Sequence, residues 1–288
     1  MIPAPFSYHR PRTIEEATAL LVEHGDDGRV LAGGQSLIAM MKLRLATPQH
    51  LIDLGAIGDL KGIRKTGDTL VIGATTTQHE LQQSRLATEA APILLEASLL
   101  IADPQVRYVG TVGGNVANGD PGNDMPAVMM CLDASYRLVG PAGSRTVKAR
   151  EFYERAYATA LKLGEIITAI EIPVPPARHG FAYEKLKRKI GDYATAAAAV
   201  VLTVADGKVA TCALALSNLA ETALLASDAA AAVVGTSLEQ PAIDAAVAAA
   251  RAIMAPASDT RGSAEYRTYA GGVIVERALR RAFTRAGV

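Results

Sequence analysis

Hydrophobic and polar positions in the first third of the chain switch between helical and strand-like spacing. Residues 13–16 form a capping-box pattern, apolar residues then recur at helical spacing, and Gly25 ends the predicted helix. Arg29-Val30-Leu31 predicts a short strand that enters a glycine turn. A second β-like run, 69–74, is followed by a second capping box at 77–80. This alternation predicts a mixed α+β or α/β layer.

The middle of the chain has strand patterns that end at a proline cluster. Residues 136–139 and 145–147 flank the turn 140–143 and predict a hairpin. A further strand is expected over 165–173. The prolines within 173–176 cannot continue a helix or a central strand, so we expect a linker there.

The last third of the chain changes from strand to helix patterns. Its second and third strands surround Asp206-Gly207, a dipeptide typical of tight hairpins. The pattern predicts a separate α+β domain, a three-stranded antiparallel sheet followed by three helices. The expected strands are 181–187, 195–204 and 208–216, and the expected helices are 222–234, 240–254 and 265–285.

Composition identifies a globular chain without a bulk charge. The 288 residues are 50% hydrophobic and 20% charged, which suits a folded protein with one large or two medium domains. Lys plus Arg and Asp plus Glu both number 29. There is therefore no net positive field to hold nucleic acid or an anionic bilayer.

Cysteine content and hydropathy predict a cytoplasmic protein without its own metal cluster. Cys131 and Cys212 each lie in an apolar stretch, which favours buried thiols over a disulfide or a metal pair. The N-terminus has no apolar run typical of a secretory signal. The run 194–205 is too short to span a membrane, so any membrane association is expected to be peripheral, at the inner face.

Two glycine pairs are the candidates for chemistry, and each follows a short extended segment. Adjacent glycines permit positive φ, so successive N–H groups can converge on an anion, and a phosphate can approach the main chain. Ser36 and Thr111 add hydroxyls, and Gln35 and Asn115 add amides. The candidate residues are Ala32, Gly33, Gly34, Gln35, Ser36 and Leu37 in the first turn and Thr111, Val112, Gly113, Gly114 and Asn115 in the second.

Two such turns suit a diphosphate gripped from both sides. Neither has the spacing of a Rossmann fingerprint or of a Walker loop, and no lysine follows either one directly. Backbone dipoles would then hold the anion. Taken alone, each glycine pair is also compatible with an ordinary tight surface turn, so the residues leave nucleotide binding and simple turns both open.

Residues 32–37 with 111–115 resemble the paired FAD-diphosphate loops of the medium subunits of molybdenum hydroxylases, the xanthine dehydrogenase family. The resemblance covers nearly the whole chain and includes 5–8, 51–54 and 72–74. Two further stretches resemble the aerobic carbon monoxide dehydrogenase branch of that family: 119–126 and 183–196. Flavin subunits of related aldehyde, purine and N-heterocycle hydroxylases share many of these features and remain alternatives.

The resemblance implies a fold, a cofactor and partners. It implies an α+β protein with a two-part FAD-binding domain of the vanillyl-alcohol-oxidase (PCMH) type over 1–177, divided into about 1–56 and 57–177, and a C-terminal domain over 178–288. It implies non-covalent FAD on this chain, a molybdopterin-type molybdenum centre on a large subunit and 2Fe-2S clusters on a small subunit. The implied assembly is a dimer of heterotrimers, in which this chain passes electrons and is inactive alone.

Three further residues are implied by their place in the family motifs. Asp124 is implied at the ribose or adenosine end of FAD, although an N-cap for the following helix is an equal alternative. Tyr193 is implied to approach the isoalloxazine ring, with a partly buried strand residue as the alternative. Lys185 is a weaker candidate contact. It opens the basic run 185–189, which is either a solvated strand edge or a surface for an acidic partner.

Other kinds of chemistry find little support. His9, His24, His50, His79 and His179 are far apart in sequence and have no ligand-like spacing, so we expect solvated or turn histidines. Ser36 lacks the Gly-x-Ser-x-Gly elbow of a hydrolase. A stand-alone flavin oxidase would need a substrate cap. A colourless nucleotide-binding regulatory module is the alternative from another class, and flavin colour would distinguish the two.

Overall fold

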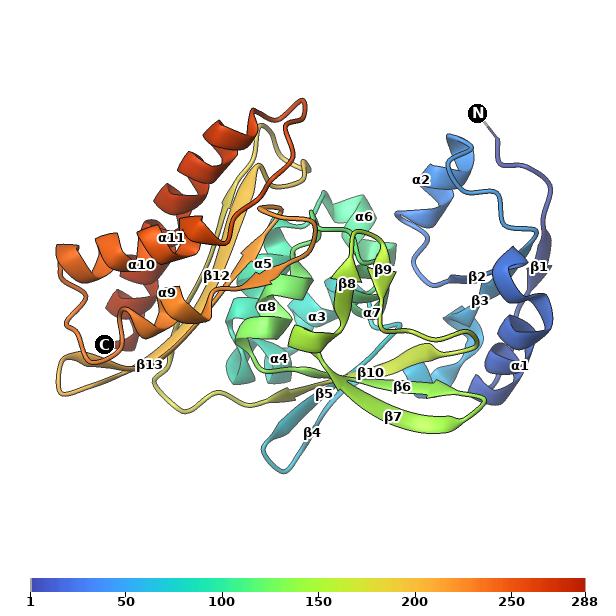
Figure 1. The fold of residues 1–288 in the computed structure, drawn as a ribbon. Coiled ribbons are helices and arrows are strands. Elements are labelled where there is room, and N and C mark those ends of the chain that lie inside the picture. Colours follow the sequence, from blue (N-terminus) through green and yellow to red (C-terminus); the bar gives the residue numbers. More distant parts are fainter. Residues whose placement is uncertain (1, 288) are drawn as a thin grey trace.

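The computed structural model describes residues 2–287 and arranges them in three units along the chain. In Figure 1 the N-terminal unit (blue) and the C-terminal unit (orange to red) lie on opposite sides of a central unit. The fold is α+β, as the sequence predicts.

The N-terminal unit is a small parallel sheet with a helix packed on it. Its strand order is β1-β3-β2, and both pairings are parallel. Thr13 caps the first helix by accepting from the Glu16 N–H, and Gly25 ends it at φ +51°. The elements are β1 (Ser7–His9), α1 (Ile14–His24), β2 (Gly28–Leu31), α2 (Leu37–Lys42) and β3 (His50–Asp53), with 3-10 turns at Gly25–Asp27, Leu54–Ala56 and Gly58–Leu60.

The central unit contains an antiparallel sheet of five strands in the order β4-β5-β10-β6-β7. The strands are β4 (Ile63–Thr66), β5 (Thr69–Gly73), β6 (Ser135–Gly140), β7 (Gly143–Lys148) and β10 (Ile166–Pro173), and a separate pair is formed by β8 (Tyr153–Arg155) and β9 (Ala158–Thr159). The predicted hairpin and the strand before the proline cluster are confirmed. β10 occupies the centre because its run Ile166–Ile170 is buried without interruption.

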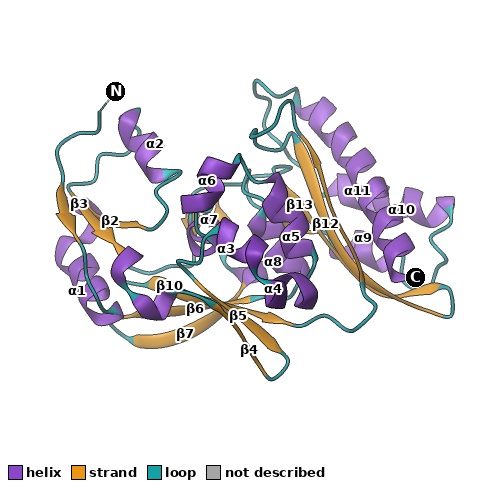
Figure 2. Ribbon diagram, turned by 180° about the vertical axis from the view of Figure 1, so that it is seen from behind, coloured by secondary structure: helices purple, strands orange, loops and turns teal. Residues whose placement is uncertain are grey.

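Six short helices lie between this sheet and the C-terminal unit (Figures 1 and 2). They are α3 (Gln78–Gln83), α4 (Arg85–Ala90), α5 (Ile93–Leu100), α6 (Pro104–Val109), α7 (Val112–Ala117) and α8 (Met125–Cys131), with a 3-10 turn at Ala149–Glu151. The capping box predicted at Thr77 and Glu80 is present in full. Every residue of α8 is buried, so this helix forms the middle of the molecule.

The C-terminal unit has one more strand than the sequence predicts. Its sheet order is β11-β12-β13-β14, all antiparallel. The predicted helix 222–234 is wrong in its first part, because Leu224 and Leu225 pair with β13 as a short edge strand. The elements are β11 (Gly180–Leu186), β12 (Ala196–Ala205), β13 (Lys208–Ser217), β14 (Leu224–Leu225), α9 (Ser227–Ala231), α10 (Gln240–Ala252) and α11 (Ala264–Ala286).

Both faces of this sheet are buried, each against a different layer. Ala197 and Ala199 of β12 belong to the core of the central unit, and their neighbours Ala196 and Ala198 pack into the C-terminal core. This alternation follows from the two-residue period of a strand. Helices α5 and α8 cover one face, α9 and α11 pack on the other, and α10 packs against α9 and α11 (Figure 2).

The two cysteines and the expected absence of a membrane span can be followed in the described residues. Both thiols are free, and Cys131 is buried as predicted, whereas Cys212 is only half-buried. Within residues 2–287, no helix combines the length and the apolar character that a membrane crossing requires.

Candidate functional site

The first glycine turn follows the short strand predicted at 29–31, here β2, and connects it to α2. Gly34 adopts φ +69°, a conformation that side chains rarely tolerate. In residues 2–287 the N–H groups of Gly33, Gly34, Gln35 and Ser36 donate to no other protein group. The turn therefore presents a run of free backbone donors, which is the arrangement expected of an anion-binding loop.

The second glycine turn differs from the prediction because it is the start of helix α7. Thr111 is the N-cap, and its hydroxyl accepts from the Gly114 N–H at 3.0 Å. The Val112 N–H donates to Thr76 and the Gly113 N–H to Ala74. These amides are occupied within the protein, so the symmetrical grip by two sets of free N–H groups is wrong. What this turn offers instead is the Thr111 hydroxyl proton and nearby amide side chains.

The two turns lie against each other. A Cβ on Gly33 would overlap the carbonyl oxygen of Val109 and lie 2.7 Å from the Cα of Gly110, just before the second turn. A Cβ on Gly114 would lie 3.8 Å from that of Ala32. The glycine at position 33 is therefore required for contact between the turns, and not only for access by a ligand.

A cleft of about 1090 Å³ opens beside the paired turns and is bounded by all three units. Its volume lies slightly above the roughly 300–1,000 Å³ range of small-molecule sites in proteins, so it has room for a large cofactor. Twelve of the fourteen predicted site residues line it; the exceptions are Val112 and Gly113, which are buried behind the second turn. The lining predicted residues are Ala32, Gly33, Gly34, Gln35, Ser36, Leu37, Thr111, Gly114, Asn115, Asp124, Lys185 and Tyr193.

Two cleft residues that the sequence did not single out have unpaired amide groups. Gln78 is 1% exposed, and neither its amide oxygen nor its nitrogen has a partner in residues 2–287. The buried Nδ2 of Asn118 is likewise unpaired. A buried polar group without a partner costs about 1–3 kcal/mol. Polar ligand groups in the cleft would remove that cost, so the site fits a dinucleotide such as FAD.

Asn115 has a more structural position than expected. Its side-chain oxygen accepts from the Met125 N–H at 3.3 Å, and its backbone oxygen accepts from the Asn123 side chain at 2.7 Å. Asn115 thus fixes the start of α8 beside the cleft and keeps only its amide nitrogen for a ligand.

Asp124 and Lys185 form a buried ion pair at one side of the cleft. Lys185 Nζ lies 2.9 Å from Asp124 Oδ2, with side-chain exposures of 1% and 6%, and it also donates to the Leu100 carbonyl. The Tyr183 hydroxyl donates to Asp124 Oδ1 at 2.5 Å. Burial raises the pKa of Asp124, and the charge of Lys185 and the Tyr183 hydrogen bond oppose that shift.

These contacts correct two expectations. Asp124 occupies the N-cap position of α8, as the alternative had it, but its side chain makes no cap bond and pairs with Lys185 and Tyr183 instead. Lys185 does not lie on a solvated edge, because its ammonium group is buried against Asp124. The sequence gives no sign of this pairing, since 61 residues separate the two side chains.

Tyr193 lies in the loop between β11 and β12 and not in a strand. Its side chain lines the cleft at 40% exposure, and the guanidinium of Arg261 lies 5.7 Å from its ring centroid. Burial is the main cause that raises the pKa of Tyr193 to about 12, while interaction with the Ser36 hydroxyl opposes the shift. Tyr193 therefore approaches the first glycine turn from the C-terminal unit.

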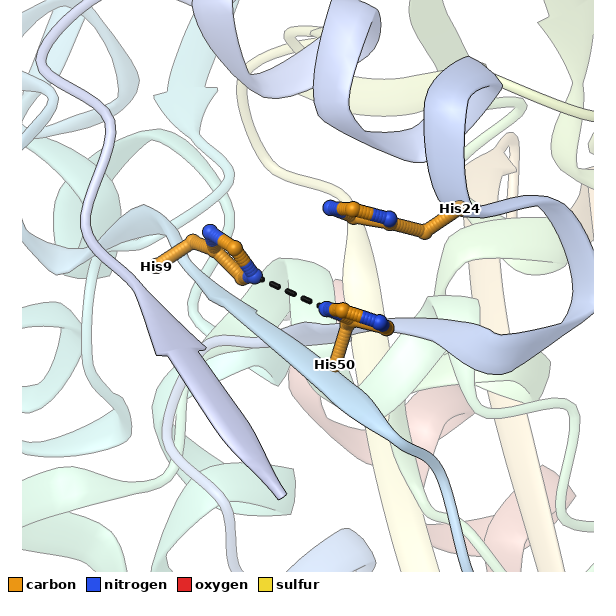
Figure 3. A group of neighbouring side chains, drawn as sticks. All are labelled: His9, His24 and His50. Carbon is orange, nitrogen blue, oxygen red and sulfur yellow. Dashed lines mark hydrogen bonds between the residues drawn. The ribbon is translucent and has the colours of Figure 1, made fainter.

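Three of the five histidines, which the sequence analysis expected to be scattered, come together in the N-terminal unit (Figure 3). His9, His24 and His50 are contributed by β1, α1 and β3. Strand pairing and helix packing join them, and neither is visible as a sequence spacing.

Comparison with known proteins shows which family this chain belongs to. The chain matches the family described as FAD binding domain in molybdopterin dehydrogenase over residues 4–175, and CO dehydrogenase flavoprotein C-terminal domain over residues 181–282. It is 62% identical over 286 residues to the carbon monoxide dehydrogenase medium chain of Afipia carboxidovorans, with 99% of each chain covered. It is 47% identical over 285 residues to that of Hydrogenophaga pseudoflava, again with 99% of each covered.

Solved structures agree with this placement. A chain of the Cu,Mo-CO dehydrogenase in its cyanide-inactivated form superimposes with a TM-score of 0.98 at 61% identity, covering 99% of this chain and 100% of that one. A chain of quinoline 2-oxidoreductase from Pseudomonas putida 86 gives 0.95 at 31% identity, with both chains fully covered. The chain belongs to the FAD-binding flavoprotein subunits of the molybdopterin dehydrogenase family. Within that family it is a medium chain of the carbon monoxide dehydrogenase type.

Proposed function

We propose that this chain is the electron-transfer subunit of a carbon monoxide dehydrogenase. A large molybdenum subunit would convert carbon monoxide and water to carbon dioxide, with release of two protons and two electrons. A small subunit with 2Fe-2S clusters would carry the electrons here, and the complex would be a dimer of heterotrimers. The full-length 62% identity to a carbon monoxide dehydrogenase medium chain supports this proposal most directly.

The chemistry supplied by bound, non-covalent FAD is electron transfer between the 2Fe-2S clusters and an external acceptor such as a quinone. The free N–H groups of residues 33–36 would hold the diphosphate, and the Thr111 hydroxyl would donate from the other side. Gln78 and Asn118 would hydrogen-bond polar groups of the cofactor. Their unpaired amides inside the cleft support this assignment.

The remaining site residues have positioning functions in this proposal. Asp124 and Lys185 form the cleft wall at the ribose or adenosine end, and their mutual pairing keeps that wall fixed. Tyr193 covers the flavin ring from the C-terminal unit, and its exposed position on the cleft supports that placement. No proton-transferring pair is required, because the electron transfer belongs to the cofactor.

We also propose that the chain divides into a FAD-binding domain over 1–177, with parts of about 1–56 and 57–177, and a C-terminal domain over 178–288. The ranges of the two family matches support this division. The proline cluster after β10 supports the same boundary.

A flavin-deficient complex tests the electron path. Gly33→Val should lose most of its flavin, because the new side chain overlaps the Val109 carbonyl and separates the two turns. In the assembled complex, carbon monoxide should still reduce the 2Fe-2S clusters, as followed by EPR. Quinone reduction should fall at least about a hundredfold, equivalent to roughly 2.7 kcal/mol of barrier.

Gly58→Val is the matched control, because a Cβ at Gly58 meets nothing within 4 Å. It should retain flavin and quinone reduction. Rapid quinone reduction by a complex that has lost its flavin would contradict the proposed path, and normal flavin in Gly33→Val would contradict the proposed diphosphate site.

A further inference from the structure

The three clustered histidines in the N-terminal unit bring three possible metal-ligand nitrogens close together. His9 ends β1, His24 ends α1 and His50 begins β3 (Figure 3). The His24 and His50 rings stack with centroids 3.7 Å apart and planes 5° from parallel. His9 Nε2 lies 3.0 Å from His50 Nδ1, and one nitrogen from each ring can be chosen so that all three lie within 4.8 Å of one another.

We propose that His9, His24 and His50 form a binding site for one divalent transition-metal ion, with zinc as the natural candidate. Imidazole nitrogen suits zinc, copper and nickel, and the cluster has no carboxylate of the kind that magnesium or calcium requires. Three histidines leave a fourth position of a tetrahedral ion for water. The site is separate from the FAD cleft, because none of the three side chains lines it.

The nitrogen separations are close to those of a coordinated ion, but the stacked His24 and His50 rings must turn about their side-chain bonds first, because an imidazole lone pair lies in the ring plane. Two nitrogens that each lie about 2.05 Å from a tetrahedral zinc are about 3.3 Å apart. The His9–His50 pair, at 3.0 Å, already has nearly this separation. The His24 nitrogen lies within 4.8 Å of the other two and must move closer to them for coordination. The three imidazoles are only half-buried, so solvent lies beside them and their rings have room to turn.

An unpaired nitrogen also favours a bound ion over a purely hydrogen-bonded cluster. The His9–His50 contact uses one nitrogen of each ring, whereas the buried Nε2 of His24 has no hydrogen-bond partner in the part of the chain that the structure describes. Leaving a buried polar atom unpaired is unfavourable. A metal ion among the three rings would give the His24 nitrogen a partner, once the His24 and His50 rings turn out of their parallel stack.

Such an ion would stabilise the unit that carries the first glycine turn. His50 pairs with Ser7 of β1 and with Gly28 of β2, and β2 leads directly into that turn. Coordination would join β1, α1 and β3 around the start of β2. The ion would therefore stabilise the fold of this unit and would take no part in electron transfer.

Zinc binding by the full-length chain tests the site. The chain is prepared without a polyhistidine tag, freed of metal with a chelator and titrated with zinc sulfate at pH 8. We expect one tightly retained zinc per chain by plasma mass spectrometry, and a rise in Tm on zinc addition. His24→Asn should weaken zinc binding at least about tenfold, the effect that loss of even an outer-shell partner has at metal sites.

His179→Asn is the matched control. It also removes a buried, unpaired Nε2, but from the linker and far from the cluster in sequence. It should bind zinc as the parent chain does, and His50→Asn should behave like His24→Asn. Far-UV circular dichroism of the metal-free variants confirms that they are folded. Equal zinc retention in the parent chain and both cluster variants, or no zinc retention by the folded parent chain, would overturn the proposal.

Discussion

Lys185 is a single residue whose environment reverses the expectation from sequence. The basic run around it is typical of a solvated strand edge, yet its ammonium group is buried against Asp124. The burial arises from pairing between β11 and β12 and from packing on α8, which brings together residues distant in sequence. A charge this deeply buried persists only when it is paired and hydrogen-bonded.

Removal of this lysine should therefore destabilise the chain strongly. We expect Lys185→Met to lower the free energy of unfolding by about 3–5 kcal/mol, because Asp124 is left as a buried carboxylate without a counter-charge. Urea unfolding at pH 7 measures the effect. The exposed Lys189→Met is the control. Lys185→Met combined with Asp124→Asn should recover part of the loss; no recovery would mean that Lys185 contributes mainly through packing.

Glu165 gives the stability a dependence on acid. Both its oxygens accept from Arg145 at 2.7 Å, and this hydrogen bonding lowers the pKa of Glu165 from its ordinary value of 4.5. A carboxyl with a lowered pKa in the folded state contributes stability above pH 4.5, and the contribution is lost as pH falls through the folded-state pKa.

Glu165→Gln should accordingly reduce the unfolding free energy at pH 7 by on the order of 1 kcal/mol, since the pair is partly screened by solvent. The difference from the parent chain should shrink as pH falls below 4.5. Chemical denaturation over a pH series measures it. Glu89→Gln, from the exposed Arg85–Glu89 pair, should change little. A difference that persists at low pH would show that the pair is not its cause.

Residue chemistry in the sequence identified the first glycine turn but not the histidine cluster. A turn is local, and glycine, hydroxyl and amide residues identify it directly. The cluster depends on parallel pairing of β3 with both β1 and β2, which no local pattern encodes. For the same reason Gln78 was missed, since its unpaired amide becomes evident only when helix α3 meets the second turn.

Among the elements, α11 packs closely on β11 at a glycine. A Cβ on Gly180 would overlap the Ala282 carbonyl oxygen and lie 2.8 Å from the Cβ of Ala286. Gly180→Ala should therefore destabilise the chain by about 1–3 kcal/mol, the usual cost of overpacking. Thermal unfolding measures the change, with Gly58→Ala as control. Equal Tm values for the two variants would mean that the helix moves aside without cost.

Elements were predictable where their signals are local. The Asp206-Gly207 turn has φ +51° and +72°, so the dipeptide specified the β12–β13 hairpin correctly. The alanines of segment 222–234 predict a helix over its whole length. In its first part, however, Leu224 and Leu225 pair with β13 and form a short strand instead. Propensity is a weak guide where a sheet edge is available.

At the scale of the whole molecule, Glu96 connects the central and C-terminal units. Its carboxylate accepts from the Tyr183 N–H at 2.6 Å, from Arg281 at 3.1 Å and from Arg285 at 2.8 Å. The two arginines lie on α11, and Glu96 lies on α5. One carboxylate on a central helix is thus bonded both to a strand and to the last helix of the C-terminal unit.

Loss of this charge should loosen the connection between the units. We expect Glu96→Ala to cost about 1–3 kcal/mol, because its three donors lose their shared acceptor, and to speed proteolysis within linker residues 174–179. Timed digestion with mass spectrometry measures the cleavage. Glu276→Ala removes only an exposed pair with Arg280 and should leave the linker as resistant as in the parent chain. Unchanged cleavage in Glu96→Ala would mean that apolar packing alone joins the units.

The sheet of the C-terminal unit, with one face in each core, limits how these proteins can recombine. Odd and even residues of β12 lie in different hydrophobic cores, so the side chains of this one strand must pack well against two different layers. A chimera joined at the linker would bring one parent's small alanines against another parent's α8, with gaps or overlaps that neither parent contains. The two halves are therefore expected to be inherited together, and exchange between relatives should succeed only when α5 and α8 accompany the sheet.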